Sequence, residues 1–220
     1  WAQRLEWRPS QDLDTRERAE AYYAALFDRH LTVDFVPPGA DDARLAAYPL
    51  LVVPALYLAT AAAGAGLRRY VEGGGTLLVS YFSGIVDEHD AVHPGPHPGA
   101  LRETLGLVVE EFQPLRAGQR VRLAAPDGPR LTGDVWAETV VTAGAEPVWT
   151  YADGPAAGRA AITRHRLGAG TAWYVSSRLA ADGLDAVLAR AAADAGIAPR
   201  EELPRDVEVV RREGESGSFV

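Results

Sequence analysis

Hydrophobic positions recur at helical or strand spacing from residue 15 to residue 82. Residues 15–30 predict an amphipathic helix, because apolar side chains fall on one stripe of its surface. Residues 31–39, "LTVDFVPPG", predict a strand that ends at its prolines. The members of the helical stripe are Ala19, Tyr22, Tyr23, Leu26 and Phe27.

Two continuous apolar runs follow, "LLVVPAL" at 50–56 and "TLLVSYF" at 76–82. Such runs are typical of strands that are buried on both faces of a parallel sheet. Residues 59–75 between them predict a helix that ends at a run of glycines. Strand, helix and strand in this order indicate βαβ units. We therefore expect an α/β fold with three layers, α/β/α, and a mostly parallel sheet.

The middle of the chain reads as short strands separated by turn residues, after a helix predicted over 97–106. One hairpin is expected to turn at Gly168–Gly170, and residues 179–196 predict a closing amphipathic helix. Three tryptophans lie on these predicted strands and are expected in the core: Trp136, Trp149 and Trp173.

Composition narrows the possible partners. Apolar residues make up 47% of the 220 residues, which suits a packed core, and the formal net charge is −8. No basic patch is present, so a nucleic acid partner is not expected. The longest apolar run, 49–67, is diluted by Pro, Gly and Ala, and we interpret it as a strand and a helix rather than a membrane span. The absence of Cys excludes disulfides, thiolate zinc sites and a cysteine nucleophile.

The two ends suggest connections to other domains. Residues 1–14 have no clean period, and residues 206–220 read as a strand, a Gly/Ser turn and the start of a second strand. We therefore expect the chain to be an internal piece of a longer protein.

Four motifs, in this order, carry a family resemblance: "TVDFVPP", "LLVVPALYL", "GGTL" and "SGIVDEHDAVH" followed by "PGALRE". The chain resembles the middle, trimerisation domain of family 42 glycoside hydrolases, the bacterial β-galactosidases. That resemblance implies a flavodoxin-like fold similar to class I glutamine amidotransferases.

The resemblance also implies an organisation and a role. Residues 1–14 would be the linker from an upstream catalytic barrel, 15–198 the trimerisation domain, and 199–220 a linker with the first strands of a C-terminal β domain. The expected partners are those two missing domains and two further copies of the chain. The parent enzyme would hydrolyse terminal β-D-galactosides with retention, in the cytoplasm. No cofactor and no membrane partner is expected, and the piece alone would be inactive.

An amidotransferase-like fold raises the question of a nucleophile. The elbow pattern G-x-C-x-G aligns with residues 80–84 and puts Phe82 at the nucleophile position, where an aromatic ring cannot attack a carbonyl. Ser83 is one place away and would need His89 or His93 as its base. We interpret the stretch as a degenerate elbow kept for its shape. The alternative is an amidotransferase-like hydrolase that uses Ser83.

The loop over 87–97 gathers carboxylate and imidazole groups. Asp87, His89, His93 and His97 could supply zinc ligands, which makes a metal or small-molecule module a second alternative. Prolines and glycines from position 94 exclude a helical ligand pair. We predict no metal and interpret the loop as structural and interfacial.

Paired carboxylates offer no glycosidase centre. Adjacent strand residues Glu110 and Glu111 point to opposite faces, whereas a retaining pair must lie about 5 Å apart. The resemblance places both catalytic glutamates on the barrel, outside this chain, so no catalytic residue is assigned. The expected interface residues are Trp1, Trp7, Tyr81, Phe82, Asp87, His89, His93 and His97.

Overall fold

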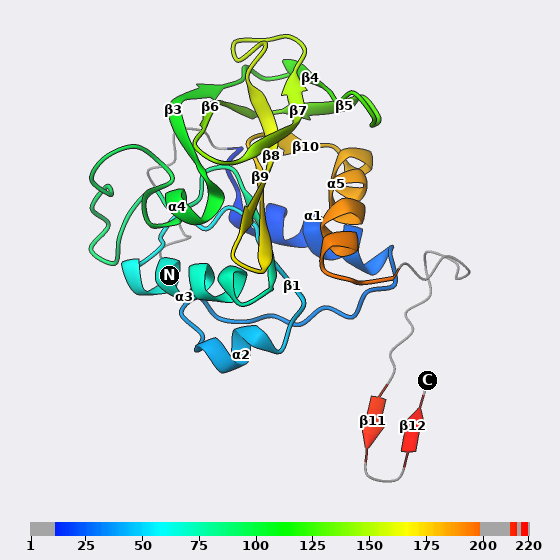
Figure 1. Ribbon diagram of the computed structural model, residues 1–220. Coiled ribbons are helices and arrows are strands. Elements are labelled where there is room, and N and C mark those ends of the chain that lie inside the picture. The colour runs from blue at the N-terminus through cyan, green and yellow to red at the C-terminus, as the bar shows by residue number, and fades with distance from the viewer. Residues whose placement is uncertain (1–11, 199–211, 215–216, 220) are drawn as a thin grey trace.

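The fold is built from five α-helices, one 3-10 turn and twelve strands in the part of the chain that the computed structural model describes, residues 12–198, 212–214 and 217–219 (Figure 1). The helical elements are α1 (Thr15–Phe27), α2 (Asp42–Ala46), α3 (Ala61–Glu72), η1 (Gly99–Leu101), α4 (Arg102–Leu105) and α5 (Ala181–Asp194). The strands are β1 (Leu50–Val53), β2 (Thr76–Ser80), β3 (Leu107–Pro114), β4 (Arg120–Ala124), β5 (Leu131–Asp134), β6 (Trp136–Thr142), β7 (Glu146–Tyr151), β8 (Ala160–Leu167), β9 (Gly170–Val175), β10 (Arg178–Leu179), β11 (Arg212–Gly214) and β12 (Gly217–Phe219).

Ten of these strands form one curled, mixed sheet. Its main path is β1-β2-β9-β8-β7-β4-β5-β10, and β6 joins it through β8 while also pairing with β3. Only β1–β2 and β2–β9 are parallel, and every other pair in the sheet is antiparallel.

The expectation of a three-layer, mostly parallel, flavodoxin-like or amidotransferase-like fold is therefore wrong. The βαβ unit β1–α3–β2 exists as predicted. The short strands of the middle, however, join the same sheet as antiparallel hairpins and outnumber the parallel strands. Local patterning identified these strands, but it carries no information about which neighbour each one pairs with.

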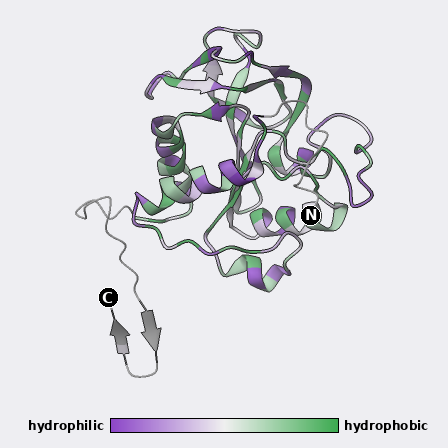
Figure 2. Ribbon diagram, turned by 180° about the vertical axis from the view of Figure 1, so that it is seen from behind, coloured by the Kyte–Doolittle hydropathy of each residue, from purple (hydrophilic) through white to green (hydrophobic). Residues whose placement is uncertain are grey.

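Helices cover both faces of the sheet where β2 and β9 run together. Alternation along β2 sends Leu78 into a cluster with α1 and α5, and Leu77 and Val79 into a cluster with α3. Figure 2 shows hydrophobic and hydrophilic residues together on the helices, as expected for helices that bury one side only. Burying one Leu or Val side chain fully, rather than leaving it exposed to water, stabilises the folded state by about 1.5–3 kcal/mol.

The core positions of the tryptophans are confirmed. Trp136 and Trp149 are 0% exposed and Trp173 is 2% exposed. Each indole N–H has an acceptor: Glu138, the Pro129 carbonyl and Asp194, respectively. The predicted helices near residues 15–30, 59–75 and 179–196 and the hairpin that turns before Gly170 are also confirmed.

The strand expected at 31–39 is not formed. Residues 31–37 belong to no helix or strand, and in the described part of the chain β1 pairs only with β2. Leu31 and Val33 pack with the α1/α5 cluster, while Val36 packs with the α3 cluster. The alternation of apolar and polar residues in this stretch therefore marks the side chains that pack on the core. A segment that pairs with no strand can show the same alternation.

A groove of about 580 Å³ lies between this segment and β1, and α1 and α3 complete its walls. Its lining is predominantly apolar and includes Tyr23, Phe35 and Leu50. No helix among the described residues is long and apolar enough to cross a membrane. Past α5, β11 and β12 form a separate antiparallel hairpin, which confirms the strand–turn–strand pattern predicted near the end of the sequence.

Candidate functional site

The turn after β2 has the geometry of a sharp elbow. Phe82 adopts a φ of 55°, which is uncommon for a residue with a side chain. Its ring is 6% exposed and packs against Tyr57, Trp136 and Phe112, with ring centroids 5.4, 5.1 and 5.8 Å away. Strained backbone of this kind persists only where the surroundings hold it in place. Here the surroundings are an aromatic cluster that fills the space above the elbow.

Ser83 faces the interior and not a cleft. It is 1% exposed, and its hydroxyl donates to the Ser80 carbonyl at 2.7 Å while accepting from the Leu56 N–H at 2.9 Å. Both contacts are to backbone groups, and among the hydrogen bonds described for Ser83 none involves an imidazole. This geometry does not fit a serine nucleophile. It fits a side chain that ties the elbow to the segment leaving β1.

Beneath the elbow lies a carboxyl group that the sequence analysis missed. Glu138 on β6 is 0% exposed and accepts hydrogen bonds from Trp136 Nε1 at 3.0 Å, Tyr174 OH at 2.6 Å and the Phe82 N–H at 3.3 Å. Burial raises the pKa of Glu138 to about 7, and the three donors act against that rise. The burial of Glu138 could have been predicted from the sequence. On a strand, residues 136, 138 and 140 lie on the same face, so Glu138 shares its face with the apolar Trp136 and Val140.

The loop over 87–97 is ordered by its own hydrogen bonds. One carboxylate oxygen of Asp87 accepts from the His89 and Ala91 N–H groups at 2.8 and 3.0 Å, and these bonds lower the pKa of Asp87. His93 Nε2 lies 2.7 Å from the Ala59 carbonyl. The loop is therefore attached to the body of the domain, with Val92, which forms a bridge with Val86, 64% exposed.

The three histidines of this loop point to different places. His89 is exposed, His93 contacts the Ala59 carbonyl, and the His97 ring stacks on Phe112 with centroids 5.1 Å apart. Burial lowers the pKa of His97, and the nearby His93 acts in the same direction. Among the described residues, no group of three His, Asp or Glu side chains is arranged to hold a metal ion.

The predicted interface residues divide into three groups. Tyr81 and Phe82 are buried within this chain, at 1% and 6% exposure, and form part of the core. Asp87, His89, His93 and His97 are exposed or half-buried on the loop. Trp1 and Trp7 lie outside the described residues. Among the predicted interface residues that the structure describes, the loop group is the one that reaches the surface, and its interface role stays a prediction.

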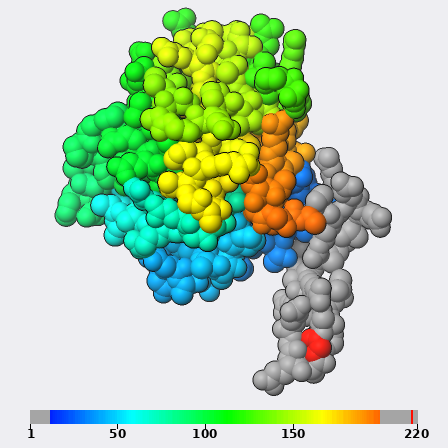
Figure 3. All heavy atoms as spheres, in the orientation of Figure 1, coloured from blue at the N-terminus to red at the C-terminus, as the bar shows by residue number. Residues whose placement is uncertain are grey.

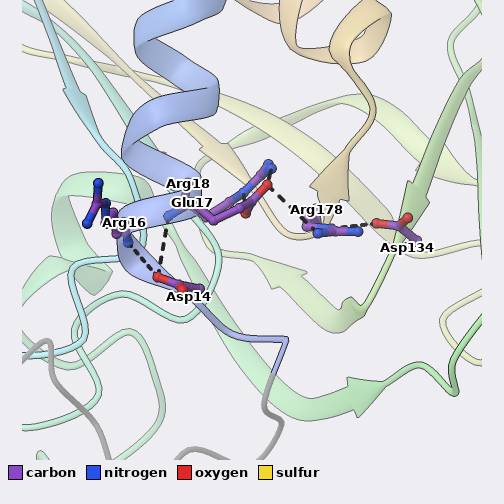
Figure 4. Close-up of polar contacts among 6 residues, drawn as sticks. All are labelled: Asp14, Arg16, Glu17, Arg18, Asp134 and Arg178. Atoms are coloured by element: carbon purple, nitrogen blue, oxygen red, sulfur yellow. Dashed lines mark hydrogen bonds and ion pairs between the residues drawn. The ribbon is translucent and has the colours of Figure 1, made fainter.

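Charged residues at the start of α1 connect this helix to the sheet (Figure 4). Asp14 caps the helix by accepting from the N–H groups of Arg16 and Glu17 at 2.9 and 3.3 Å. Figure 4 shows Glu17 between two guanidinium groups, and Arg178 reaches on to Asp134 at 2.7 Å. The second guanidinium belongs to the buried Arg18. In these ion pairs each charged group lies beside a group of opposite charge. Together they connect α1 with β5 and β10.

The arrangement as a whole is that of a packed scaffold. The elbow is filled by aromatic rings, the serine beside it bonds to backbone, and the acidic loop is held by its own amides.

The comparisons with known proteins identify the class. The family described as the β-galactosidase trimerisation domain matches residues 1–198. A β-galactosidase from an Arthrobacter species is 39% identical over 221 residues, which covers 100% of this chain and 31% of that protein. The chain therefore belongs to the family of β-galactosidase trimerisation domains.

Solved structures agree with this assignment. The crystal structure of a β-galactosidase from Bacillus circulans sp. alkalophilus matches with a TM-score of 0.92 and 28% identity, over 99% of this chain and 33% of that one. A β-galactosidase from the haloarchaeon Halorubrum lacusprofundi matches with a TM-score of 0.83 and 32% identity, over 90% and 29%. The chain spans about a third of the length of these relatives.

Proposed function

We propose that this chain is the assembly domain of a larger β-galactosidase and joins three copies of that enzyme. The observation that carries the proposal is the family match over residues 1–198, together with relatives three times as long that are named β-galactosidase. The catalytic carboxylates would lie on a barrel preceding residues 15–198, and a β domain would begin within 199–220. The parent enzyme would hydrolyse terminal β-D-galactosides with retention.

The filled elbow supports a non-catalytic role for the domain itself. A retaining glycosidase needs two carboxyl groups facing a sugar-sized cleft about 5 Å apart. Glu138 is enclosed by Trp136, Tyr174 and the elbow backbone, where a sugar has no access. Glu110 and Glu111 lie exposed on β3.

Two measurements test the proposal. Light scattering of the whole enzyme across a concentration series should give three times the subunit mass. The 220-residue chain should release no product from a chromogenic β-galactoside that the whole enzyme hydrolyses. A whole enzyme that remains monomeric at every concentration, or hydrolysis by the chain alone, would overturn the proposal.

A further inference from the structure

The segment that follows α1, residues 31–37 and called the strap below, forms one wall of the groove, and β1 forms the other. The strap runs to Pro37 without a turn or a bend. None of the hydrogen bonds described for it uses a backbone N–H group of residues 32–36. β1 is free along one edge, since β2 is its one partner among the described strands. Two backbones with unpaired groups therefore border a groove of about 580 Å³.

The side chains of the strap and of β1 divide between the same two sides of the sheet. On the strap, Val33 packs with the α1/α5 cluster and Val36 packs with the α3 cluster. On β1, Val52 packs with the first of these clusters and Val53 with the second. Neighbouring strands of one sheet send their side chains alternately to the same two faces. The strap therefore has the alternation that a strand beside β1 requires.

The connection from the strap to β1 suits a parallel pair. Parallel strands need a connection of about a dozen residues or more, usually through a helix. Residues 38–49 have that length and contain α2. One hydrogen bond already joins the two sides, because the Tyr48 hydroxyl donates to an Asp34 carboxylate oxygen at 3.0 Å. Pro37 and Pro38 have no N–H group, so strand pairing would end where the connection begins.

The strap lies at the surface of the molecule. Figure 3 shows the blue spheres of the chain between α1 and β1 along the bottom of the view. Phe35 of the strap is 73% exposed and stacks on Tyr23 of α1, with ring centroids 6.0 Å apart. An open sheet edge is a template for pairing with other chains, so covering β1 would protect the domain from association. A strand in the groove would also remove apolar surface from water.

We propose that the strap closes on β1 as an added parallel strand, which fills the groove and covers the free edge of the sheet. Both ends of the strap can stay anchored during this movement. The Leu31 N–H donates to the Leu26 carbonyl at 3.1 Å, and the Ala40 N–H donates to the Pro37 carbonyl at 3.1 Å. The structure described above is the open state. The inference is independent of the proposed trimer, because every group that it uses belongs to one chain.

Hydrogen exchange followed by NMR tests the closed state in the unmodified 220-residue chain. An edge strand turns every second N–H group toward its partner and the others toward solvent. One alternate set of strap amides, either residues 32, 34 and 36 or residues 33 and 35, should exchange about tenfold more slowly than the other set. Exchange at one uniform rate across the five amides overturns the inference.

A disulfide gives a second readout, because the chain contains no Cys. V33C is combined with L50C or with V52C, since all three side chains pack with the α1/α5 cluster. The matched control combines T32C with the same partners, because a closed strap would turn residue 32 to the opposite face. Mild oxidation should link one of the V33C pairs about tenfold faster than either T32C pair, since a disulfide requires close and aligned Cβ atoms.

The linked variant also connects the two measurements. Formation of the V33C disulfide should strengthen the alternating protection of the strap amides, and reduction should return it to the level of the unmodified chain. T32C pairs that link as fast as V33C pairs overturn the inference, because the strap then presents no fixed face to β1. If the cysteine variants fail to fold, the exchange pattern of the unmodified chain decides.

Discussion

Glu138 shows how much one residue can shape the interior of this domain. Its carboxyl group joins the elbow after β2, the indole of Trp136 on β6 and the phenol of Tyr174 on β9. A buried carboxylate is costly, and three donors offset only part of that cost. The residue therefore holds three elements together while making their stability depend on pH.

The first prediction concerns the sign of that dependence. The pKa of Glu138 is raised from 4.5 to about 7 in the folded chain, so the folded state binds its proton more tightly than the unfolded state. The free energy of unfolding should therefore fall as pH rises from about 4.5 to about 7, by at most about 3 kcal/mol from this group.

E138Q provides the measurement, because an amide keeps the shape of the protonated carboxyl group. Urea denaturation at pH 5 and pH 8 should show a smaller loss of stability in E138Q than in the parent chain. E111Q, at an exposed position on β3, is the control. Equal pH dependence in E138Q and the parent chain would contradict the assignment.

A second prediction concerns Ser83. Removing its hydroxyl in S83A leaves the half-buried Leu56 N–H without its acceptor, which should lower the free energy of unfolding by about 1–3 kcal/mol. T150A is the matched control, since its hydroxyl makes only a long contact of 3.5 Å to the Ala124 carbonyl. The two are compared by urea denaturation. An S83A chain as stable as the parent would show that this hydroxyl does not support the elbow.

At the scale of elements, α3 determines how closely the chain can fold back after the 87–97 loop. A Cβ at Gly64 would lie 2.6 Å from the Ala100 carbonyl oxygen and 2.7 Å from the Ala100 Cβ. The helices α3 and η1 can therefore pack this closely only because residue 64 has no side chain. Gly66, two residues along the same helix, has nothing nearer than 3.7 Å to such a Cβ. The two glycines therefore have different roles.

The third prediction uses this pair. G64A should destabilise the chain by about 1–3 kcal/mol, because backbone and side chain must both move to admit the methyl group. G66A should stabilise it by about 0.5–1 kcal/mol, because alanine favours the helix and no close contact opposes it. Thermal or urea unfolding of the two variants checks the opposite signs. Shifts in the same direction would contradict the packing described for α3.

The unpaired side of β1 gives a fourth prediction. Amides of Leu50–Val53 that face the groove should exchange with solvent faster than those of β2, which is paired on both sides. Hydrogen exchange followed by mass spectrometry or NMR measures the difference. Equal protection of β1 and β2 in the isolated chain would show that a partner strand covers β1.

At the scale of the whole molecule, the sequence predicted the elements better than their arrangement. Helices near 15–30, 59–75 and 179–196 could be predicted because their apolar residues follow the helical period. The sheet could not, because β7 pairs with β4 and β10 pairs with β5, and these partners are separated in the sequence by other strands and leave no local pattern. The strand expected at 31–39 failed for a related reason, since alternation does not reveal whether a partner edge is reached.

The candidate site divides in the same way. The elbow pattern that the resemblance implies aligned with Phe82, and the structure gives this residue a φ of 55°. That Ser83 bonds to the backbone could not be predicted, because the Leu56 N–H comes from another part of the chain. The loop histidines diverge because His93 contacts the Ala59 carbonyl and His97 stacks on Phe112, whereas His89 is exposed.

The pairing of β2 with β9 has a consequence for how the chain is made. Thr76 lies beside Thr171, so the parallel part of the sheet joins strands that are 95 positions apart in the sequence (171 − 76). On the ribosome, β1, α3 and β2 emerge long before the strand that must lie next to them. Their apolar faces stay exposed to solvent until β9 and α5 have been synthesised. Bringing together segments so far apart in the sequence also slows folding. Synthesis of this domain therefore includes an interval in which its N-terminal half needs protection from other chains.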